Sequence, residues 1–248
     1  MIYTFDGMAE FHDVNAAREM TPSAVLRYLQ RAANDHFLAR VPSFDYLRDE
    51  MKLAFVLSRM AVDMIIPIRY QDKFTVRTWT VESKGYAFNR CFEIVKDGEV
   101  AVRASSIWAL LDLRDMKMSR VENHDFGFVD EPACTTDSPI RFRIPKHEEG
   151  VPPTALRQVL YSDIDCNMHM NNTRYPDLLC DYIPDIEHRR VRGFTVSWAH
   201  EASFGKTIEI FASNEQDDPN CFIFRMREQS SAPSDSIVHA RIVTELME

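Results

Sequence analysis

The pattern of apolar and polar positions divides the chain into two similar halves, each with one helical segment followed by strands. In the first half, Thr21 is a good N-cap and Pro22 occupies the first helical position. Apolar side chains then recur every three or four residues, which is typical of a helix that buries one face. The residues on this face are Val25, Tyr28, Leu29, Ala32, Ala33 and His36.

Four strands are predicted after this helix. Their apolar patterns cover residues 56–66, 74–81, 88–95 and 100–111. Asp97-Gly98 separates the last two strands, and this dipeptide favours a two-residue hairpin turn.

The second half repeats the order of helix and strands. A short helix is predicted over residues 171–182, with Pro176 in its first turn, and Glu201 lies at the end of the first strand that follows. Phe222, Phe224 and Met226 alternate with arginines, as expected for a sheet with one polar face. The strand patterns cover residues 191–201, 206–212, 221–228 and 237–246.

The segment between the halves shows neither the helical nor the strand periodicity of apolar residues. Residues 114–153 contain five prolines and many charges, which predicts a linker that crosses the surface. We therefore expect an α+β protein with an N-terminal module over residues 1–113 and a C-terminal module over residues 154–248.

An internal duplication accounts for this organisation. Residues 13–30 align without a gap on residues 163–180, and Asp72-Lys73 aligns with Gly205-Lys206 at an offset of 133. Three polar residues of the second half then stand opposite residues of a different kind. Asn167 falls opposite Ala17, His169 opposite Glu19, and Glu201 opposite Ile68. A polar set that occurs in one copy only suggests one working site.

Composition narrows the class of protein. The 248 residues are 45% hydrophobic and 27% charged, as in an ordinary globular protein, and the net charge is −9. An acidic chain does not attract the nucleic-acid backbone, so no nucleic-acid partner is expected. Residues 1–12 lack the pattern of a signal peptide, and the apolar runs are shorter than the roughly 18 residues that a membrane span needs. We expect a cytoplasmic protein without a membrane span.

Several local motifs are absent. The seven glycines are too widely spaced for a G-x-G-x-x-G, P-loop or G-x-S-x-G motif. The eight histidines and five cysteines form no local zinc motif, although ligands from distant segments stay possible. We expect no cofactor and no metal, and five reduced cysteines packed as small apolar groups.

The densest run of polar residues covers 163–172. If it is extended, Asp163, Asp165, Asn167 and His169 share one face. One interpretation is that these side chains bond the local backbone and cap the next helix. The other is a site for acid–base chemistry. A calcium loop is disfavoured because it lacks its turn glycine and has Arg174 at the twelfth position.

The sequence Y-S-D-I-D-C-N-M-H-M-N-N-T-R-Y, residues 161–175, resembles the signature of the acyl-acyl carrier protein thioesterases of plants and bacteria. The sequence A-V-R-A-S-S-I-W-A-L-L, residues 101–111, resembles the strand before the linker in that family. The resemblance implies tandem hotdog modules, each a long helix wrapped by an antiparallel sheet, as the two-module pattern also suggests.

The resemblance also implies the site residues. The Asp, Asn and His of the family box fall on Asp165, Asn167 and His169, and the acidic residue of the following strand falls on Glu201. Many relatives have a cysteine next, where this chain has Ala202, so a cysteine at that position cannot attack the substrate. Cys166 is an alternative nucleophile, and His200 is expected to be a structural residue.

The reaction that these residues suggest is hydrolysis of a thioester by an activated water. Either Glu201 or His169 would accept the proton of the water, and His169 or a water would protonate the departing thiolate. Asn167 would hold the water or the carbonyl, and Asp165 would orient its neighbours. Backbone N–H groups of the helix that begins near Asn171 are candidates to stabilise the oxyanion.

The family implies a fatty acyl chain on acyl carrier protein as the substrate. Five apolar residues of the first module are candidates to line the acyl tunnel, and each can equally be core: Val25, Tyr28, Leu29, Ala32 and Phe55. Because carrier proteins are acidic, a local basic surface is needed. The candidates are Arg189, Arg190 and Arg192, or Arg141, Arg143 and Lys146 in the linker.

The alternatives are an acyl-coenzyme A thioesterase, a dehydratase or hydratase on the same scaffold, and an acyl-binding module without catalysis. Because a duplicated module can supply its own pairing, the chain is expected to be a monomer or a homodimer.

Overall fold

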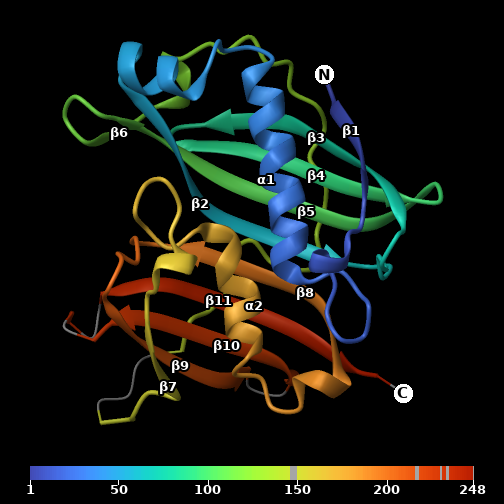
Figure 1. The fold of residues 1–248 in the computed structure, drawn as a ribbon. Helices are drawn as coiled ribbons and strands as arrows, with labels where there is room; N and C mark the ends of the chain where they lie inside the picture. The colour runs from blue at the N-terminus through green and yellow to red at the C-terminus, as the bar shows by residue number, and fades with distance from the viewer. Residues whose placement is uncertain (146–149, 216–217, 230, 233–234, 248) are drawn as a thin grey trace. The chain divides into compact units, whose positions relative to one another are not determined.

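The computed structural model describes residues 1–145, 150–215, 218–229, 231–232 and 235–247. It contains two compact units (Figure 1). The first comprises Met1–Met20 and Ala24–Ile140, and the second comprises Thr21–Ser23 and Arg141–Glu248.

The sheet of the first unit is antiparallel, with strand order β1-β3-β4-β5-β2, and a short strand β6 pairs with β5. The long strands agree with the sequence prediction to within a few residues, whereas β1 and β6 were not predicted. Their bounds are β1 Tyr3–Met8, β2 Leu53–Met64, β3 Lys73–Lys84, β4 Ala87–Lys96, β5 Glu99–Asp112 and β6 Lys117–Ser119.

The predicted Asp97-Gly98 turn joins β4 and β5. Both residues have positive φ, 52° and 84°, as a turn that matches the twist of the two strands requires. Lys96 pairs with Glu99 across this turn.

Helix α1 (Pro22–Leu38) begins at the predicted residue and lies across one face of this sheet (Figure 1). Val25, Leu29 and Ala32 are fully buried, which confirms the predicted apolar face. The ring of Tyr28 packs edge-on against Phe74 of β3, with 5.0 Å between the ring centroids. The even-numbered residues of β3 therefore face the helix, and the odd-numbered residues face away from it.

The second unit has a sheet of order β8-β11-β10-β9-β7, in which all pairs are antiparallel. Strand β7 was not predicted. The bounds are β7 Ala155–Gln158, β8 Arg189–Trp198, β9 Thr207–Glu215, β10 Asp218–Glu228 and β11 Ser236–Leu246.

The helix of this unit is shorter than predicted. A 3-10 turn, η5 (Asn172–Arg174), comes first, and α2 covers only Tyr175–Cys180. The side chain of Asn171 accepts a hydrogen bond from the backbone N–H of Thr173 at 2.9 Å, which fixes the tight turn. Pro176 then lies in the first turn of α2, where its missing N–H costs no helical hydrogen bond.

The structure also corrects the end of β8. The strand ends at Trp198, so Glu201 lies in the loop after it and not on the predicted strand. The backbone N–H groups of Ala199 and His200 both donate to Ile237 O, which turns the chain away from the sheet.

The predicted linker contains short elements of regular structure. Within residues 114–145 the structure contains β6 and a 3-10 turn, η3 (Val121–Asn123). Lys146 lies outside the described residues. Among the described residues, no helix combines the length and apolarity required to cross a membrane.

Candidate active site

The polar run of the second unit forms a tight turn, so the condition of an extended backbone is not met. Ile164 and Met170 pair as an isolated antiparallel bridge, and the N–H of Asp165 donates to His169 O at 3.0 Å. Met168 has a φ of 64°, and its N–H donates to Asp165 O at 3.0 Å. The turn closes because the Asp165 carboxylate accepts the N–H of Asn167 at 2.9 Å, a local bond that Asp favours.

An extended strand would place Asp163 on the same face as the other polar residues, but its side chain points elsewhere. It is buried, and its two carboxylate oxygens accept hydrogen bonds from Arg157 at 2.7 and 2.8 Å. Burial alone would raise the pKa of this carboxyl, but the bonds from Arg157 and from the N–H of Leu160 lower it. Asp163 therefore anchors the start of the turn as an ionised group.

His169 and Glu201 meet side chain to side chain. Nδ1 of His169 lies 3.0 Å from Oε2 of Glu201. Two backbone contacts hold the segments together: His169 pairs with Ser203 as an antiparallel bridge, and the N–H of Met170 donates to Ala202 O at 2.8 Å. The pair is open to solvent, because the side chain of His169 is 32% exposed and that of Glu201 is 66% exposed.

The chemistry of this contact fixes the role of each ring nitrogen. An ionised carboxylate only accepts hydrogen bonds, so Nδ1 must carry the proton that it donates to Glu201. In the neutral imidazole, Nε2 then has a lone pair that is available to accept a proton. This is the arrangement of a base oriented by a carboxylate.

Asp165 and Asn167 belong to the same turn, although the structure gives them different roles. The Asp165 carboxylate holds the backbone of the turn, whereas the Asn167 side chain is exposed. Cys166, the alternative nucleophile, is also exposed in this turn, and His200 is exposed beside Glu201.

Tyr175 is a further residue at this site that the sequence argument did not single out. Its side chain is almost fully buried and packs edge-on against Trp198, with 6.4 Å between the ring centroids. Burial raises the pKa of this phenol, and the negative charges of Glu201 and Asp165 raise it further. Its position at the end of the polar run was the available signal.

The first unit contains the same turn without the same chemistry. Val14 pairs with Met20, the N–H of Asn15 donates to Glu19 O at 2.9 Å, and Arg18 has a φ of 62°. These features match the turn of the second unit at an offset of 150 residues, which confirms the predicted alignment there.

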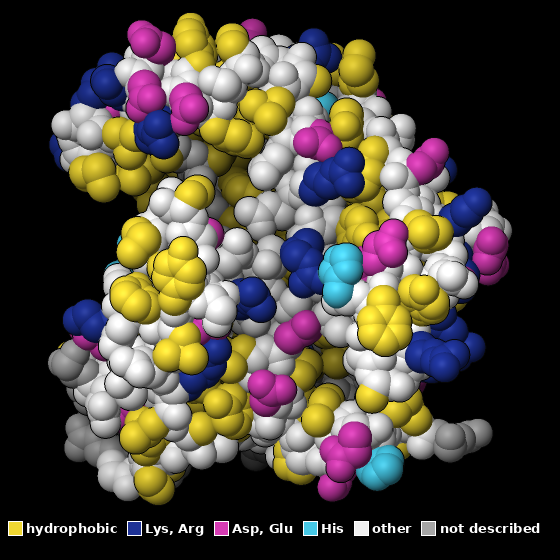
Figure 2. Space-filling view, viewed as in Figure 1, with side chains coloured by type: hydrophobic (Ala, Val, Ile, Leu, Met, Phe, Trp, Pro, Cys, Tyr) yellow, Lys and Arg dark blue, Asp and Glu magenta, His cyan; other side chains and the backbone are white. Residues whose placement is uncertain are grey.

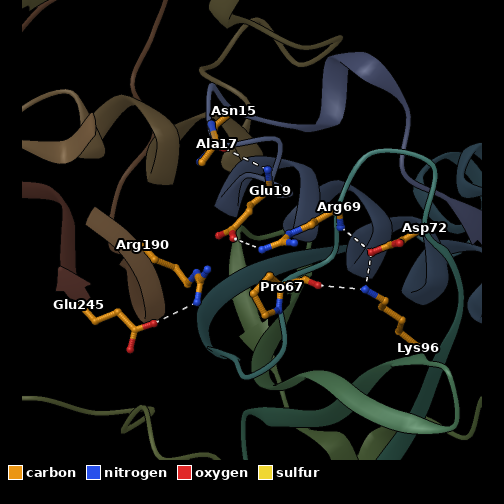
Figure 3. Close-up of polar contacts among 9 residues, drawn as sticks. All are labelled: Asn15, Ala17, Glu19, Pro67, Arg69, Asp72, Lys96, Arg190 and Glu245. Atoms are coloured by element: carbon orange, nitrogen blue, oxygen red, sulfur yellow. Dashed lines mark hydrogen bonds and ion pairs between the residues drawn. The ribbon is translucent and has the colours of Figure 1, made fainter. Parts of the chain in front are cut away.

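The downstream offset is 134 and not the predicted 133. Met20 bonds to Ile68 O as Met170 bonds to Ala202 O, so Ile68 corresponds to Ala202 and Glu201 corresponds to Pro67. At the position of His169, the first unit has Glu19, which forms an ion pair with Arg69 at 3.6 Å (Figure 3). This unit therefore has an ion pair where the second unit has a potential base.

The five candidates for acyl binding have different environments. Val25, Leu29 and Ala32 are fully buried in the core. The hydroxyl of Tyr28 donates to the Asp13 carboxylate at 2.8 Å, and Phe55 is partly buried in a cluster of aromatic rings. Their role in acyl binding stays a prediction.

The three candidate arginines for the carrier protein lie on β8. Arg190 and Arg192 both pair with Glu245, at 3.3 and 3.4 Å (Figure 3 shows Arg190). Arg189 instead donates hydrogen bonds to three uncharged groups, Pro184 O, Asn220 Oδ1 and Thr244 Oγ1. In the part of the chain that the structure describes, no group of three or more His, Cys, Asp or Glu side chains is placed to hold a metal ion.

Comparison with solved structures identifies the fold. An acyl-ACP thioesterase from Bacteroides thetaiotaomicron aligns with a TM-score of 0.86 and 24% identity, over 98% of both chains. The 12:0-ACP thioesterase from Umbellularia californica aligns with a TM-score of 0.81 and 18% identity, over 99% of this chain and 97% of that chain. The protein is thus an α+β protein of the double-hotdog class, as predicted.

The family follows from the sequence models. Residues 5–126 match the acyl-ACP thioesterase N-terminal domain and residues 152–243 match the C-terminal domain. The chain belongs to the acyl-ACP thioesterase family, which confirms the resemblance seen in the sequence.

Curated relatives show a similar level of identity. The chloroplastic palmitoyl-acyl carrier protein thioesterase of Cuphea hookeriana is 23% identical over 218 residues, which are 80% of this chain and 51% of that protein. The chloroplastic dodecanoyl-[acyl-carrier-protein] hydrolase of Cinnamomum camphora is 24% identical over 223 residues, 80% of this chain and 56% of that protein. The chain spans about half the length of the curated relatives it matches.

Proposed function

We propose that the protein hydrolyses the thioester of a fatty acyl-acyl carrier protein and releases the free fatty acid. Membership of the acyl-ACP thioesterase family supports this substrate class. The observation that carries the proposal is the contact of 3.0 Å between His169 Nδ1 and Glu201 Oε2.

The reaction begins when Nε2 of His169 takes a proton from a water molecule. The oxygen of this water attacks the thioester carbonyl, while Glu201 stabilises the imidazolium through Nδ1–H. The tetrahedral intermediate then expels the carrier thiolate, and His169 returns the proton to the sulfur. No covalent bond to the protein forms, in keeping with Ala202 beside Glu201.

The turn positions the other two residues of the box. Asp165 holds the N–H of Asn167, and this bond fixes the backbone two residues before His169. The exposed amide of Asn167 is then available to hold the water or the carbonyl. Backbone N–H groups at the start of the helix stay candidates for the oxyanion, although Asn171 already uses that of Thr173.

The carrier protein is expected to dock through a local basic surface. Basic and acidic side chains are interspersed on the face shown in Figure 2. Since Glu245 pairs with Arg190 and Arg192, Arg189 is the better candidate of the three. We expect kcat/KM on acyl carrier protein substrates to fall as salt rises, and a flat dependence would contradict this docking surface.

One assay tests the proposed function. The protein is incubated with an acyl-acyl carrier protein, with the acyl-coenzyme A of the same chain and with a 3-hydroxyacyl carrier protein. Released thiol is measured, and the acyl group is analysed by mass spectrometry. We expect thiol release with the highest kcat/KM on the carrier protein. Release from coenzyme A alone, loss of the hydroxyl without thiol, or binding without turnover would each contradict the proposal. The expected cytoplasmic location and the monomeric or homodimeric state stay predictions.

A further inference from the structure

Residues 129–138, here called the strap, cross the face of the first sheet that lies opposite α1. The strap begins at β3, where the N–H of Glu131 donates to Thr80 O at 2.9 Å and Trp79 Nε1 donates to Pro132 O at 2.8 Å. It ends at β2, where the Asp63 carboxylate accepts the N–H groups of residues 137 and 138 at 2.7 and 2.8 Å. The strap therefore spans the sheet from β3 across β4 and β5 to β2.

Two cysteines meet in the middle of this crossing. Cys91 is in β4, where it pairs with Trp79 of β3 and Ser105 of β5. Its neighbour Arg90 bonds to His36 of α1, so Cys91 faces away from the helix and toward the strap. Cys134 lies above it, and its Sγ is 2.7 Å from Sγ of Cys91.

Two further contacts fix this pair in place. The N–H of Cys134 donates to Cys91 Sγ at 3.0 Å, and Cys134 Sγ lies 3.2 Å from Ala104 O on the next strand. Cys91 is 3% exposed, whereas Cys134 is partly accessible. A disulfide bond is about 2.05 Å long, so the sulfurs need to approach by only a fraction of an ångström.

The same contacts prepare Cys91 for reaction. Hydrogen bonds from the thiol and the N–H of Cys134 lower the pKa of the Cys91 thiol, against the effect of burial. A lower pKa raises the fraction of thiolate, which is the reactive form of cysteine.

We propose that Cys91 and Cys134 form a reversible disulfide that fastens the strap to the sheet. The oxidant is a small hydroperoxide. The Cys91 thiolate attacks one oxygen of hydrogen peroxide, the O–O bond breaks, and hydroxide leaves with the released proton as water. The sulfur of Cys134 then attacks the sulfenic acid, expels a second water and completes the disulfide. Two thiols are oxidised and one peroxide is reduced.

The bond would act on a segment that reaches α1. Just before the strap, Phe126 and Phe128 pack against Phe37 near the end of the helix, with ring centroids 5.6 and 6.3 Å apart. A disulfide between Cys134 and β4 restrains residues 126–134 at the C-terminal end of that segment. It also closes a loop between positions 43 apart in the chain, which limits the freedom of the unfolded state.

The test uses the full chain carrying Cys166→Ser, because Cys166 is exposed and would react independently. The protein is treated with hydrogen peroxide, thiols are counted, and the digested protein is analysed by mass spectrometry before and after dithiothreitol. We expect a loss of two thiols, a peptide pair linked through residues 91 and 134 that dithiothreitol separates, and a Tm increase of roughly 5–10 °C.

Cys134→Ser is the matched variant, and it should abolish both the link and the Tm increase. Cys180→Ser is the control, because Cys180 is buried in α2 and should leave both unchanged. Retention of all thiols, a link through any other pair, or oxidation of Cys91 to the sulfinic acid without a link would overturn the proposal. The mapping on the folded parent protein decides this even if a variant does not fold.

Discussion

Replacing Glu201 with Gln tests whether the carboxylate acts through His169. Gln keeps the size of the side chain and removes the charge that stabilises the imidazolium. A hydrogen bond to a charged group is worth about 1.5–3 kcal/mol. Because the Glu201 side chain is 66% exposed, we take the lower end, which corresponds to a roughly tenfold loss of kcat.

The assay is thiol release from an acyl-acyl carrier protein, measured for the single variants Glu201→Gln and His169→Ala and for the double variant. If Glu201 acts only by orienting and stabilising His169, its replacement should change little once His169 is absent. His200→Ala is the control, since the proposed reaction assigns no step to this exposed neighbour. A tenfold loss from Glu201→Gln in the His169→Ala background would refute the reasoning, and it would indicate that Glu201 is itself the base.

Three further predictions concern stability. Asp163→Asn should lower the free energy of unfolding in urea by about 2–4 kcal/mol at pH 6, because it leaves Arg157 without its charged partner. This loss should shrink as pH falls through the lowered pKa of Asp163. An equal loss at pH 3 would contradict this. Burial, with the charge of Arg90, lowers the pKa of His36 to about 4, so the unfolded chain binds a proton between pH 6.5 and 4 that the folded chain does not. Stability should fall by up to about 3 kcal/mol as pH drops through this window, and His36→Gln should flatten the profile; an unchanged slope would count against the assignment. Phe37→Ala should lower the free energy of unfolding by about 3–5 kcal/mol, because Phe37 is 5% exposed and packs among four aromatic rings. A loss below 1 kcal/mol in chemical denaturation would show that the cluster is loosely packed.

Much of the fold is visible in the sequence because local rules and tertiary packing agree there. The start of α1 follows from Thr21 and Pro22, and the hairpin between β4 and β5 follows from Asp97-Gly98. The short strands β6 and β7 depend on a neighbouring strand for their hydrogen bonds, and their own sequences carry little pattern.

The residues of the site were predictable from the sequence, but the backbone conformation that holds them was not. The family box led to His169 and Glu201, which the structure brings into contact. The extended interpretation was wrong because Met168 adopts a left-handed conformation that an alternating pattern cannot reveal. The downstream offset was wrong by one residue, because backbone hydrogen bonds such as those to Ile68 O and Ala202 O define the alignment there, and the residue types do not reveal them.

Contacts between distant segments lie beyond such reasoning. Cys91 and Cys134 are far apart in the chain, and no spacing rule pairs them. They meet because the strap follows a particular path across the sheet, which the prolines and charges of residues 114–153 do not specify.

The most direct test of the account is the rate at which the His169→Ala protein releases thiol from an acyl-acyl carrier protein. Loss of a general base typically costs 10² to 10⁴ in rate, so we expect turnover at least a hundredfold below that of the parent protein, with an unchanged unfolding transition. Turnover close to that of the parent protein, in a variant that folds normally, would contradict the claim that this imidazole activates the water.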